Sequence, residues 1–394
     1  MFRAEKWNPQ AWAKLFKQAG AKYVVPVAEH HDGFAMWDSE LTTWDAMERG
    51  PKRDIIGELE KACRDQGMRY APSYHRERHP SYYAKKMYVV ESEPLPEIVA
   101  EINKASEAAE LYGPFTYTDA FIADYVARWK EIQDKYKPDM LWVDDIPVFY
   151  MVKSERNHPQ VVKYKQACAG MIADYFNTAQ KWGKEVYLNN KGRREPNWPK
   201  GIGARSMDNM KIKEFPAPNW ENPATIAHSY GYNRLEEQMG AYGDSTTKIQ
   251  LMVDVVSKNG SFLLNIGPRA DGTIPQGQKQ VLLDIGEWLK VNGEAIYGTR
   301  PWIQFGQSQS VQEHTLNYRY TAKPGTVYVT AFQDDKKPIL LKAFQDFEKK
   351  IKSVTSLCNG THLSWQMKAE GLQILPPEER VLKHAVVYKV EYIE

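Results

Sequence analysis

Short apolar runs alternate with longer segments of helical spacing from the start of the chain to Leu289. Runs typical of buried strands are Ala21–Ala28 (AKYVVPVA), Arg69–Tyr74 (RYAPSY), Met140–Val143 (MLWV), Glu185–Leu188 (EVYL) and Ser261–Ile266 (SFLLNI). Segments with apolar residues at helical spacing follow or precede them at 9–19, 55–63, 121–136, 161–182, 249–256 and 281–289. Asn8, Asp54 and Asp119 are expected N-caps. This alternation predicts an α/β fold with a parallel sheet, and it favours a (β/α) TIM-like barrel over an open sheet.

The pattern changes after Gly293. Short alternating segments separated by turns occur at 316–320, 326–332, 339–341 and 386–390, which predicts a C-terminal antiparallel β-sandwich. We therefore expect a catalytic barrel domain at residues 1–298 and a sandwich domain at 299–394. The Pro-, Asn- and Trp-rich stretch from Arg194 to Asn233 is either a set of binding loops or weakly patterned strands.

Composition narrows the classes of partner. The formal net charge is +2, without a sustained charged block, so neither nucleic acid nor a membrane surface is expected as a partner. The 12 Trp and 23 Tyr suit sugar faces as well as packing. Three widely spaced cysteines argue against a disulfide framework. As written, the N-terminus has no apolar signal segment, and localisation and a homo-oligomer are left open.

Polar clusters stand where three predicted strands end. Asp144 follows the run MLWV, His30 and His31 follow AKYVVPVA, and Tyr74 and His75 close the run RYAPSY. The carboxyl ends of parallel strands line one site in such folds, so these side chains are expected together. The alternative is that Asp145 caps a turn before Pro147 and that Asp144 is simply solvated.

A strand-end aspartate suits glycoside hydrolysis, in which one carboxylate is the nucleophile and a second is the acid and base, about 5 Å apart when configuration is retained. Glu221, beside Trp220, is the candidate partner; the alternative is a glutamate on a surface loop. The adjacent His30 and His31 also raise a metal-dependent hydrolase. However, neighbouring strand residues point to opposite faces and no HExxH motif is present, so we expect no metal and no other cofactor.

Several long strings resemble the α-L-fucosidases of glycoside hydrolase family 29. They include HHDGF, starting at His30, the segment YKPDMLWVDD at Tyr136–Asp145, NWENPATIAHSYGYN at Asn219–Asn233, and SFLLNIGPRADGTI, starting at Ser261 and followed by NGEAIYGTRPW. The resemblance implies a (β/α) barrel with a C-terminal β-sandwich. It also implies metal-free, retaining release of terminal α-L-fucose from a fucosylated oligosaccharide or glycoconjugate.

The resemblance also assigns residues. It implies Asp144 as nucleophile, Glu221 as acid/base, and fucose contacts from His30, His31 and Trp142. The family's Asn-Asp-Arg reads Asn189-Asn190-Lys191 here, so Lys191 or Arg193 takes the place of the arginine. The remaining expected substrate contacts are Trp37, Tyr74 and His75.

One departure concerns the start of the chain. Family members carry an earlier strand with a His-Trp-Gly stretch, and this chain begins after that position. We therefore expect an open edge beside Ala21–Ala28 and weak catalysis as written. A non-catalytic fucose-binding protein is the remaining alternative.

Overall fold

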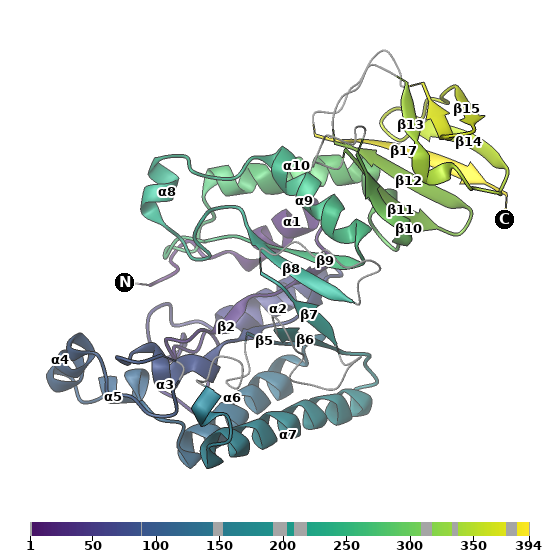
Figure 1. The fold of residues 1–394 in the computed structure, drawn as a ribbon. Helices are drawn as coiled ribbons and strands as arrows, with labels where there is room; N and C mark the ends of the chain where they lie inside the picture. Colours follow the sequence, from purple (N-terminus) through teal and green to yellow (C-terminus); the bar gives the residue numbers. More distant parts are fainter. Residues whose placement is uncertain are drawn as a thin grey trace. The chain divides into compact units, whose positions relative to one another are not determined.

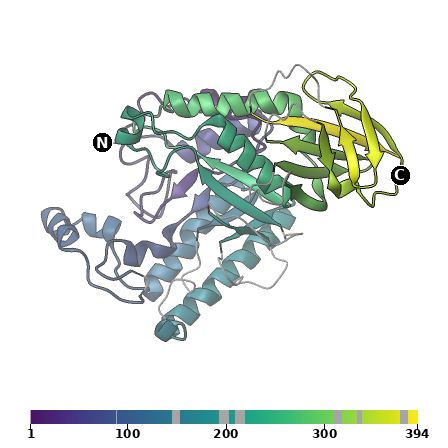
Figure 2. The same ribbon diagram turned by 45° about the horizontal axis from the view of Figure 1, so that its top comes forward.

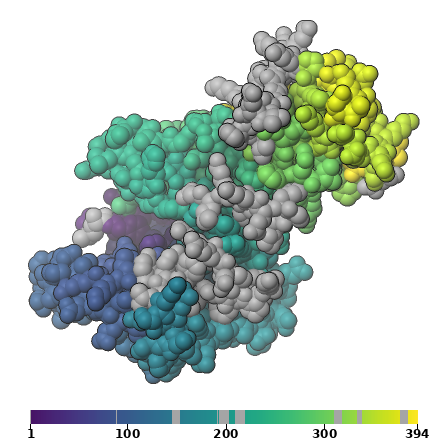
Figure 3. Space-filling model, in the orientation of Figure 1, coloured from purple at the N-terminus to yellow at the C-terminus, as the bar shows by residue number. Residues whose placement is uncertain are grey.

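The computed structural model describes residues 2–87, 89–144, 153–191, 203–208, 219–308, 317–332, 338–375 and 384–393, coloured along the sequence in Figure 3. The chain divides into two compact units. The first contains residues 1–17, 21–207 and 269–273, and the second contains residues 18–20, 208–268 and 274–394.

The first unit is built on parallel strands. The strands are β1 (Tyr23–Val24), β2 (Val27–Glu29), β3 (Arg69–Tyr70), β4 (Ser73–Tyr74), β5 (Met140–Val143), β6 (Tyr187–Lys191) and β7 (Ala204–Ser206). Strand β1 pairs with β3, and the others follow the order β2-β4-β5-β6-β7, with every pair parallel. This confirms the parallel sheet that the alternating pattern predicts.

Two expected strands are each broken by a proline. Pro26 separates β1 from β2, and Pro72 separates β3 from β4. Proline has no amide hydrogen to donate to a neighbouring strand, so the ladder is interrupted at both positions. The Pro26 carbonyl still accepts a hydrogen bond from Ser73 N at 2.7 Å. Each break therefore shortens the strands, but the segment that contains β1 and β2 still lies beside the segment that contains β3 and β4.

The helices of the first unit are α1 (Pro9–Gln18), α2 (Ile55–Asp65), α3 (His79–Tyr82), α4 (Pro96–Lys104), α5 (Ala108–Tyr112), α6 (Asp119–Tyr136) and α7 (Pro159–Lys181), with 3₁₀ turns at Arg76–Arg78 and Lys153–Glu155. Helices α6 and α7 run beside the strands of this unit, whereas α4 and α5 project away from them (Figures 1 and 2). Helices α6 and α7 lie against each other, and both share one buried core with α2 and the strands. The Asp54 side chain caps α2 as expected. Helix α6 differs, because Thr118 rather than Asp119 accepts the capping hydrogen bond from Phe121 N.

The second unit begins with a parallel pair. Strand β8 (Trp220–Thr225) pairs with β9 (Gly260–Asn265), and the helices are α8 (Arg234–Gln238), α9 (Ser245–Ser257) and α10 (Gln276–Asn292), followed by a 3₁₀ turn at Gly293–Ala295. Strand β8 is buried throughout, although it contains Pro223. Of the two interpretations of the stretch 194–233, its described part therefore supports weakly patterned strands, in β7 and β8.

Two antiparallel sheets complete the second unit. One has the order β10-β11-β12-β17-β14 and the other β13-β16-β15. Their strands are β10 (Arg300–Gln307), β11 (Tyr318–Lys323), β12 (Thr326–Ala331), β13 (Ile339–Leu341), β14 (Ile351–Ser356), β15 (Trp365–Lys368), β16 (Gly371–Ile374) and β17 (Val386–Tyr392), with a 3₁₀ turn at Lys342–Phe344. Residues of both sheets share one hydrophobic core. Among the described helices, none combines the length and the apolar character needed to cross a bilayer.

Candidate active site

The pairing of β4, β5 and β6 brings three strand ends together. Ser73 and Tyr74 pair with Trp142 and Val143, and Val143 pairs in turn with Asn190. Side chains one position further along each strand therefore meet at the carboxyl edge of the sheet. These are His75, Asp144 and Lys191, and the structure brings all three together.

Asp144 is a buried carboxylate surrounded by nitrogen atoms. Lys191 Nζ contacts its Oδ1 atom. His31 Nε2 and His75 Nδ1 each lie 3.5 Å from its Oδ2 atom. Burial alone would raise the pKa of Asp144, but His75 and Lys191 outweigh this effect and hold the pKa well below its usual range. Asp144 is therefore an ionised carboxylate at neutral pH.

The hydrogen bond of His31 fixes its tautomer. Its Nδ1 atom lies 2.5 Å from the carbonyl oxygen of His75, which can only accept, so Nδ1 carries the hydrogen. Burial, followed by the neighbouring His30 and His75, lowers the pKa of His31 to about 2, so the ring is neutral at pH 7. Its Nε2 atom is then an acceptor that faces the acceptor Asp144 Oδ2. A hydroxyl group placed beside them can donate its hydrogen to either acceptor.

His30 and Trp142 pack against the ring of His75 beside Asp144. The His30 ring stacks on His75 with a centroid distance of 4.9 Å, and His75 lies 5.2 Å from the Trp142 ring. His30 itself is exposed. The protein atoms packed around its ring nevertheless remove part of its hydration, which lowers its pKa to about 4, and the nearby His75 adds to this effect. The site therefore offers imidazole and indole surfaces around one carboxylate.

Glu77 is a buried acid close to Asp144 that the sequence did not single out. It lies in the 3₁₀ turn after β4, is fully buried, and places Oε1 3.7 Å from His31 Nδ1. Neither of its carboxyl oxygens has a hydrogen-bond partner among the described residues. Burial raises the pKa of Glu77 well above its ordinary value, and the charge of Asp144 adds to the rise.

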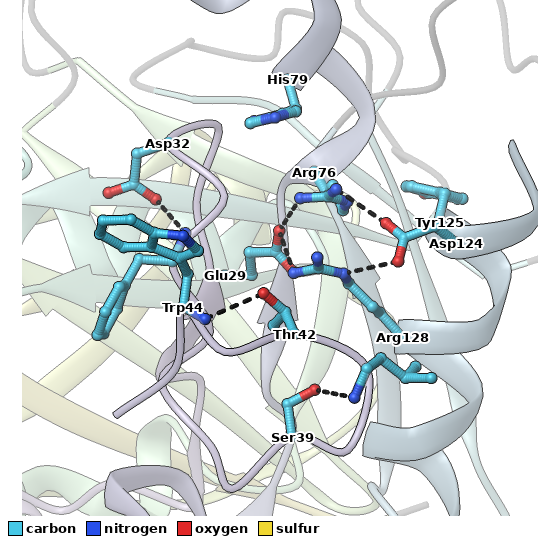
Figure 4. Close-up of polar contacts among 12 residues, drawn as sticks. Glu29, Asp32, Ser39, Thr42, Trp44, Arg76, His79, Asp124, Tyr125 and Arg128 are labelled. Atoms are coloured by element: carbon cyan, nitrogen blue, oxygen red, sulfur yellow. Dashed lines mark hydrogen bonds and ion pairs between the residues drawn. The ribbon is translucent and has the colours of Figure 1, made fainter. Parts of the chain in front are cut away.

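Two buried arginines, Arg76 and Arg128, bridge the buried Glu29 and the partly exposed Asp124 in a ring of four charges (Figure 4). Arg76 bonds Glu29 at 2.6 Å and Asp124 at 2.8 Å, while Arg128 lies 3.1 Å from Asp124 and 3.5 Å from Glu29. Glu29 directly precedes His30, and the Glu29 carbonyl accepts a hydrogen bond from His75 N at 2.9 Å. The ring therefore ties the ends of β2 and β4 to α6 and limits movement of the site histidines.

The turn after His31 needs its glycine. Gly33 has φ +84°, and a Cβ atom at this position would lie 2.7 Å from His79 Cε1. His79 Nδ1 in turn lies 2.9 Å from the carbonyl oxygen of His31. The string HHDG thus owes its glycine to backbone conformation and to close packing on His79.

Two expected substrate contacts lie elsewhere. Tyr74 is fully buried and donates its hydroxyl to the Tyr125 carbonyl oxygen at 2.9 Å. Trp37 is also fully buried, and its indole donates to Glu131 at 2.8 Å. Both side chains therefore face α6 rather than Asp144.

The predicted residues that remain are Glu221 and Arg193. Glu221 is buried in β8 of the second unit, where it pairs with Ser261. Its pairing with Asp144 stays a prediction. Arg193 lies outside the described residues, as does Asp145.

Two groups of side chains in the described part of the chain are close enough to hold a metal ion. One is His30, His31 and His75, and the other is His31, Glu77 and Asp144, with the ligand atoms of each group within 4.8 Å of one another. In the second group, however, the Lys191 ammonium already contacts Asp144. A cation at Asp144 would therefore have to compete with a built-in positive charge.

The missed residues gave only a weak signal in the sequence. Glu77 and Arg76 lie in the charged run HRERH directly after a predicted strand, a position that often contributes to a site. Asp124 and Arg128 are spaced i, i+4 on α6, which on its own indicates an ordinary surface pair. The burial of Arg76, Glu77 and Arg128 depends on contacts between segments far apart in the chain.

Residues 1–294 match the family model for alpha-L-fucosidase. Among curated proteins, the chain is 30% identical over 335 residues to an alpha-L-fucosidase of Dictyostelium discoideum, covering 84% of this chain and 64% of that protein. It is 28% identical over 389 residues to the tissue alpha-L-fucosidase of Bos taurus, covering 95% of this chain and 71% of that protein. The chain thus spans less than two thirds of the Dictyostelium relative.

A solved structure of similar fold is the alpha-fucosidase of Thermotoga maritima in complex with fucose. It superposes with a TM-score of 0.75 at 29% sequence identity, covering 99% of this chain and 80% of that chain. The same enzyme in complex with a mechanism-based inhibitor gives the same TM-score of 0.75.

Proposed function

We propose that this chain, which belongs to the alpha-L-fucosidase family, hydrolyses terminal α-L-fucose residues from fucosylated glycans with retention of configuration. The observation that carries the proposal is Asp144, a buried carboxylate at the carboxyl end of β5 that is held ionised by Lys191 and His75. A carboxylate with these properties is suited to attack an anomeric carbon. The choice of fucose as the sugar rests on the alpha-L-fucosidases that this chain resembles.

In the proposed reaction, an oxygen of Asp144 attacks C1 of fucose while the bond to the leaving oxygen breaks. Glu221 gives its proton to that oxygen, and the result is a fucosyl ester on Asp144 and a free aglycone. Glu221 then takes a proton from water, whose oxygen attacks C1 and releases fucose and the Asp144 carboxylate. The two substitutions restore the original configuration.

The proposed fucose contacts follow from the hydrogen-bonding state of each group. His31 Nε2 is an acceptor for a sugar hydroxyl, because Nδ1 carries the ring hydrogen. Lys191 is a donor beside Asp144, and its contact with the carboxylate favours Lys191 over Arg193 as the replacement for the family's arginine. His30, His75 and Trp142 supply ring surface.

Trp37 and Tyr74 enter the proposal as buried supports rather than as sugar contacts. Their polar atoms are already bonded to Glu131 and to the Tyr125 carbonyl oxygen. A fully buried ring that already has its polar partner has neither surface nor a free donor to offer a sugar.

We also propose how the chain divides into two domains. The parallel strands are expected to belong to one (β/α) barrel domain at residues 1–298, with the antiparallel sheets as a sandwich domain at 299–394. The buried position of Glu221 in β8 is compatible with its proposed role as acid/base.

The direct test is release of chromogen from an aryl α-L-fucoside beside the matched aryl α-D-galactoside. We expect turnover of the fucoside and little of the galactoside. Tight binding of fucose without turnover would instead indicate a non-catalytic fucose-binding protein. No binding and no turnover would contradict the proposal.

A metal-dependent hydrolase is the second candidate, favoured by the proximity of His31, Glu77 and Asp144. In that case, activity would disappear on chelation and return with a stoichiometric divalent ion. Activity that is unaffected by prolonged chelation would leave the two-carboxylate proposal as the better account.

A further inference from the structure

Tyr82 is an exposed aromatic side chain beside the candidate site. It ends α3 and keeps 39% of its surface exposed. Its ring centroid lies 5.5 Å from that of His31 and 6.4 Å from that of His30. Because His31 in turn contacts Asp144 at 3.5 Å, Tyr82 stands one side chain away from the proposed nucleophile.

The ring neighbours of Tyr82 contact it without parallel stacking and leave 39% of its surface exposed. His30 and Tyr83 approach at interplanar angles of 77° and 76°, and His31 approaches at 50°, so none of the three is a parallel stack. Within the described residues the Tyr82 hydroxyl has no hydrogen-bond partner. This differs from Tyr74, whose ring is buried and whose hydroxyl is bonded. Tyr82 thus presents both a partly exposed ring and an unused donor.

Further aromatic rings continue from Tyr82 away from Asp144. Tyr83 lies 4.9 Å from Tyr82, and Tyr112 of α5 lies 4.8 Å from Tyr83, both in edge-on geometry. Edge-to-face neighbours of this kind hold a ring in a fixed orientation. The position of the Tyr82 ring is therefore fixed by packing, although the ring is partly exposed.

We infer that Tyr82 forms a subsite for a second pyranose ring of the substrate, namely the sugar next to fucose in the glycan. The inference rests on the proposed function, since it needs a fucose held at Asp144 and His31. A fucose that contacts both His31 and Asp144 leaves Tyr82, which contacts His31 but not Asp144, to the adjoining sugar. The C–H face of a pyranose packs on an aromatic ring, and its hydroxyl groups can accept from a tyrosine hydroxyl.

The test compares two substrates that differ only in the group attached to C1 of fucose. α-L-Fucosyl fluoride has a single-atom leaving group and cannot reach the subsite. The second substrate is whichever of the α-1,2-, α-1,3-, α-1,4- and α-1,6-linked fucosyl oligosaccharides the wild-type chain hydrolyses best. For Tyr82→Ala we expect kcat/KM to fall about three- to tenfold on the oligosaccharide. On the fluoride it should stay within about twofold, as for an ordinary surface change. Tyr82→Phe keeps the ring and should retain most of the activity on both.

Tyr187→Ala is the matched control, because Tyr187 is 38% exposed and lies at the opposite end of β6 from Lys191. It should change neither activity. The inference is overturned if Tyr82→Ala loses activity equally on both substrates, if it loses none on the oligosaccharide, if Tyr187→Ala shows the same loss, or if wild type cleaves the fluoride but no oligosaccharide. Failure of wild type on the fluoride itself would instead refute the proposed function.

Discussion

The carboxyl group of Glu77 lies 3.7 Å from His31 Nδ1, yet that nitrogen donates its hydrogen to the His75 carbonyl oxygen instead. A fully buried carboxylate without hydrogen bonds would be a costly unpaired charge. Glu77 is therefore expected to be a neutral acid at pH 7, so that Asp144 is the ionised carboxylate beside His31.

This relationship predicts that Glu77→Gln stabilises the protein increasingly as pH rises. The pKa of Glu77 is raised above its ordinary 4.5 in the folded state. Above that ordinary value the unfolded chain releases the proton and the folded chain keeps it, so wild type loses up to about 1.4 kcal/mol per pH unit until the folded pKa is reached. Urea unfolding of both proteins at pH 5 and pH 7 measures the difference. A stability difference that does not change with pH would contradict a neutral Glu77.

Lys191→Met should move the acid limb of the kcat/KM profile to higher pH. Lys191 is one of the groups that hold the pKa of Asp144 below its usual range, so without it the nucleophile is protonated at a higher pH. We expect an activity loss of about tenfold or more near pH 5, and a smaller loss at pH 7. Lys191→Arg keeps the charge and should leave the acid limb in place. The role fails if the acid limbs of wild type and the methionine variant coincide.

Arg76→Met should destabilise the fold strongly. The change leaves the fully buried Glu29 with Arg128 at 3.5 Å as its remaining partner in the charge ring. Removing one partner of a buried pair typically costs about 3 to 5 kcal/mol. The control is Lys61→Met, which breaks an exposed pair with Asp65 and should change stability by less than about 1 kcal/mol. Equal melting temperatures for the two variants would show that the ring does not hold the site together.

The sequence was informative where the contacts are local. The apolar run ending at Val143, the polar residues after β2 and the Asp54 cap each depend on neighbouring positions, and all were predicted. The breaks at Pro26 and Pro72 could have been expected from the missing amide hydrogen.

The charge ring and Glu77 could not be predicted in the same way. Glu29, Arg76 and Asp124 lie on three separate segments, and their pairing results from how β2, the turn after β4 and α6 pack. Tyr74 and Trp37 illustrate the opposite difficulty. The family resemblance implies both as substrate contacts, but packing turns both side chains toward α6.

Glu221→Ala should separate the two steps of the proposed reaction. With an aryl fucoside that has a good leaving group, formation of the fucosyl ester needs little acid assistance, so its hydrolysis becomes limiting. Added azide should then restore turnover and give α-L-fucosyl azide, with the configuration of the substrate. The same experiment on Asp144→Gly should give the inverted β-azide. A β-azide from the Glu221 variant, or no rescue while activity is lost, would remove Glu221 from the acid/base role.

The central claim, a fucosyl ester on Asp144, is tested most directly by trapping that ester. Wild type is incubated with 2-deoxy-2-fluoro-α-L-fucosyl fluoride, and the labelled peptide is identified by mass spectrometry, with Asp144→Asn as the control. We predict one adduct per chain, located on Asp144 and absent from the folded asparagine variant. An adduct on a different residue, or hydrolysis that inverts the anomeric configuration and gives no adduct, would contradict the claim.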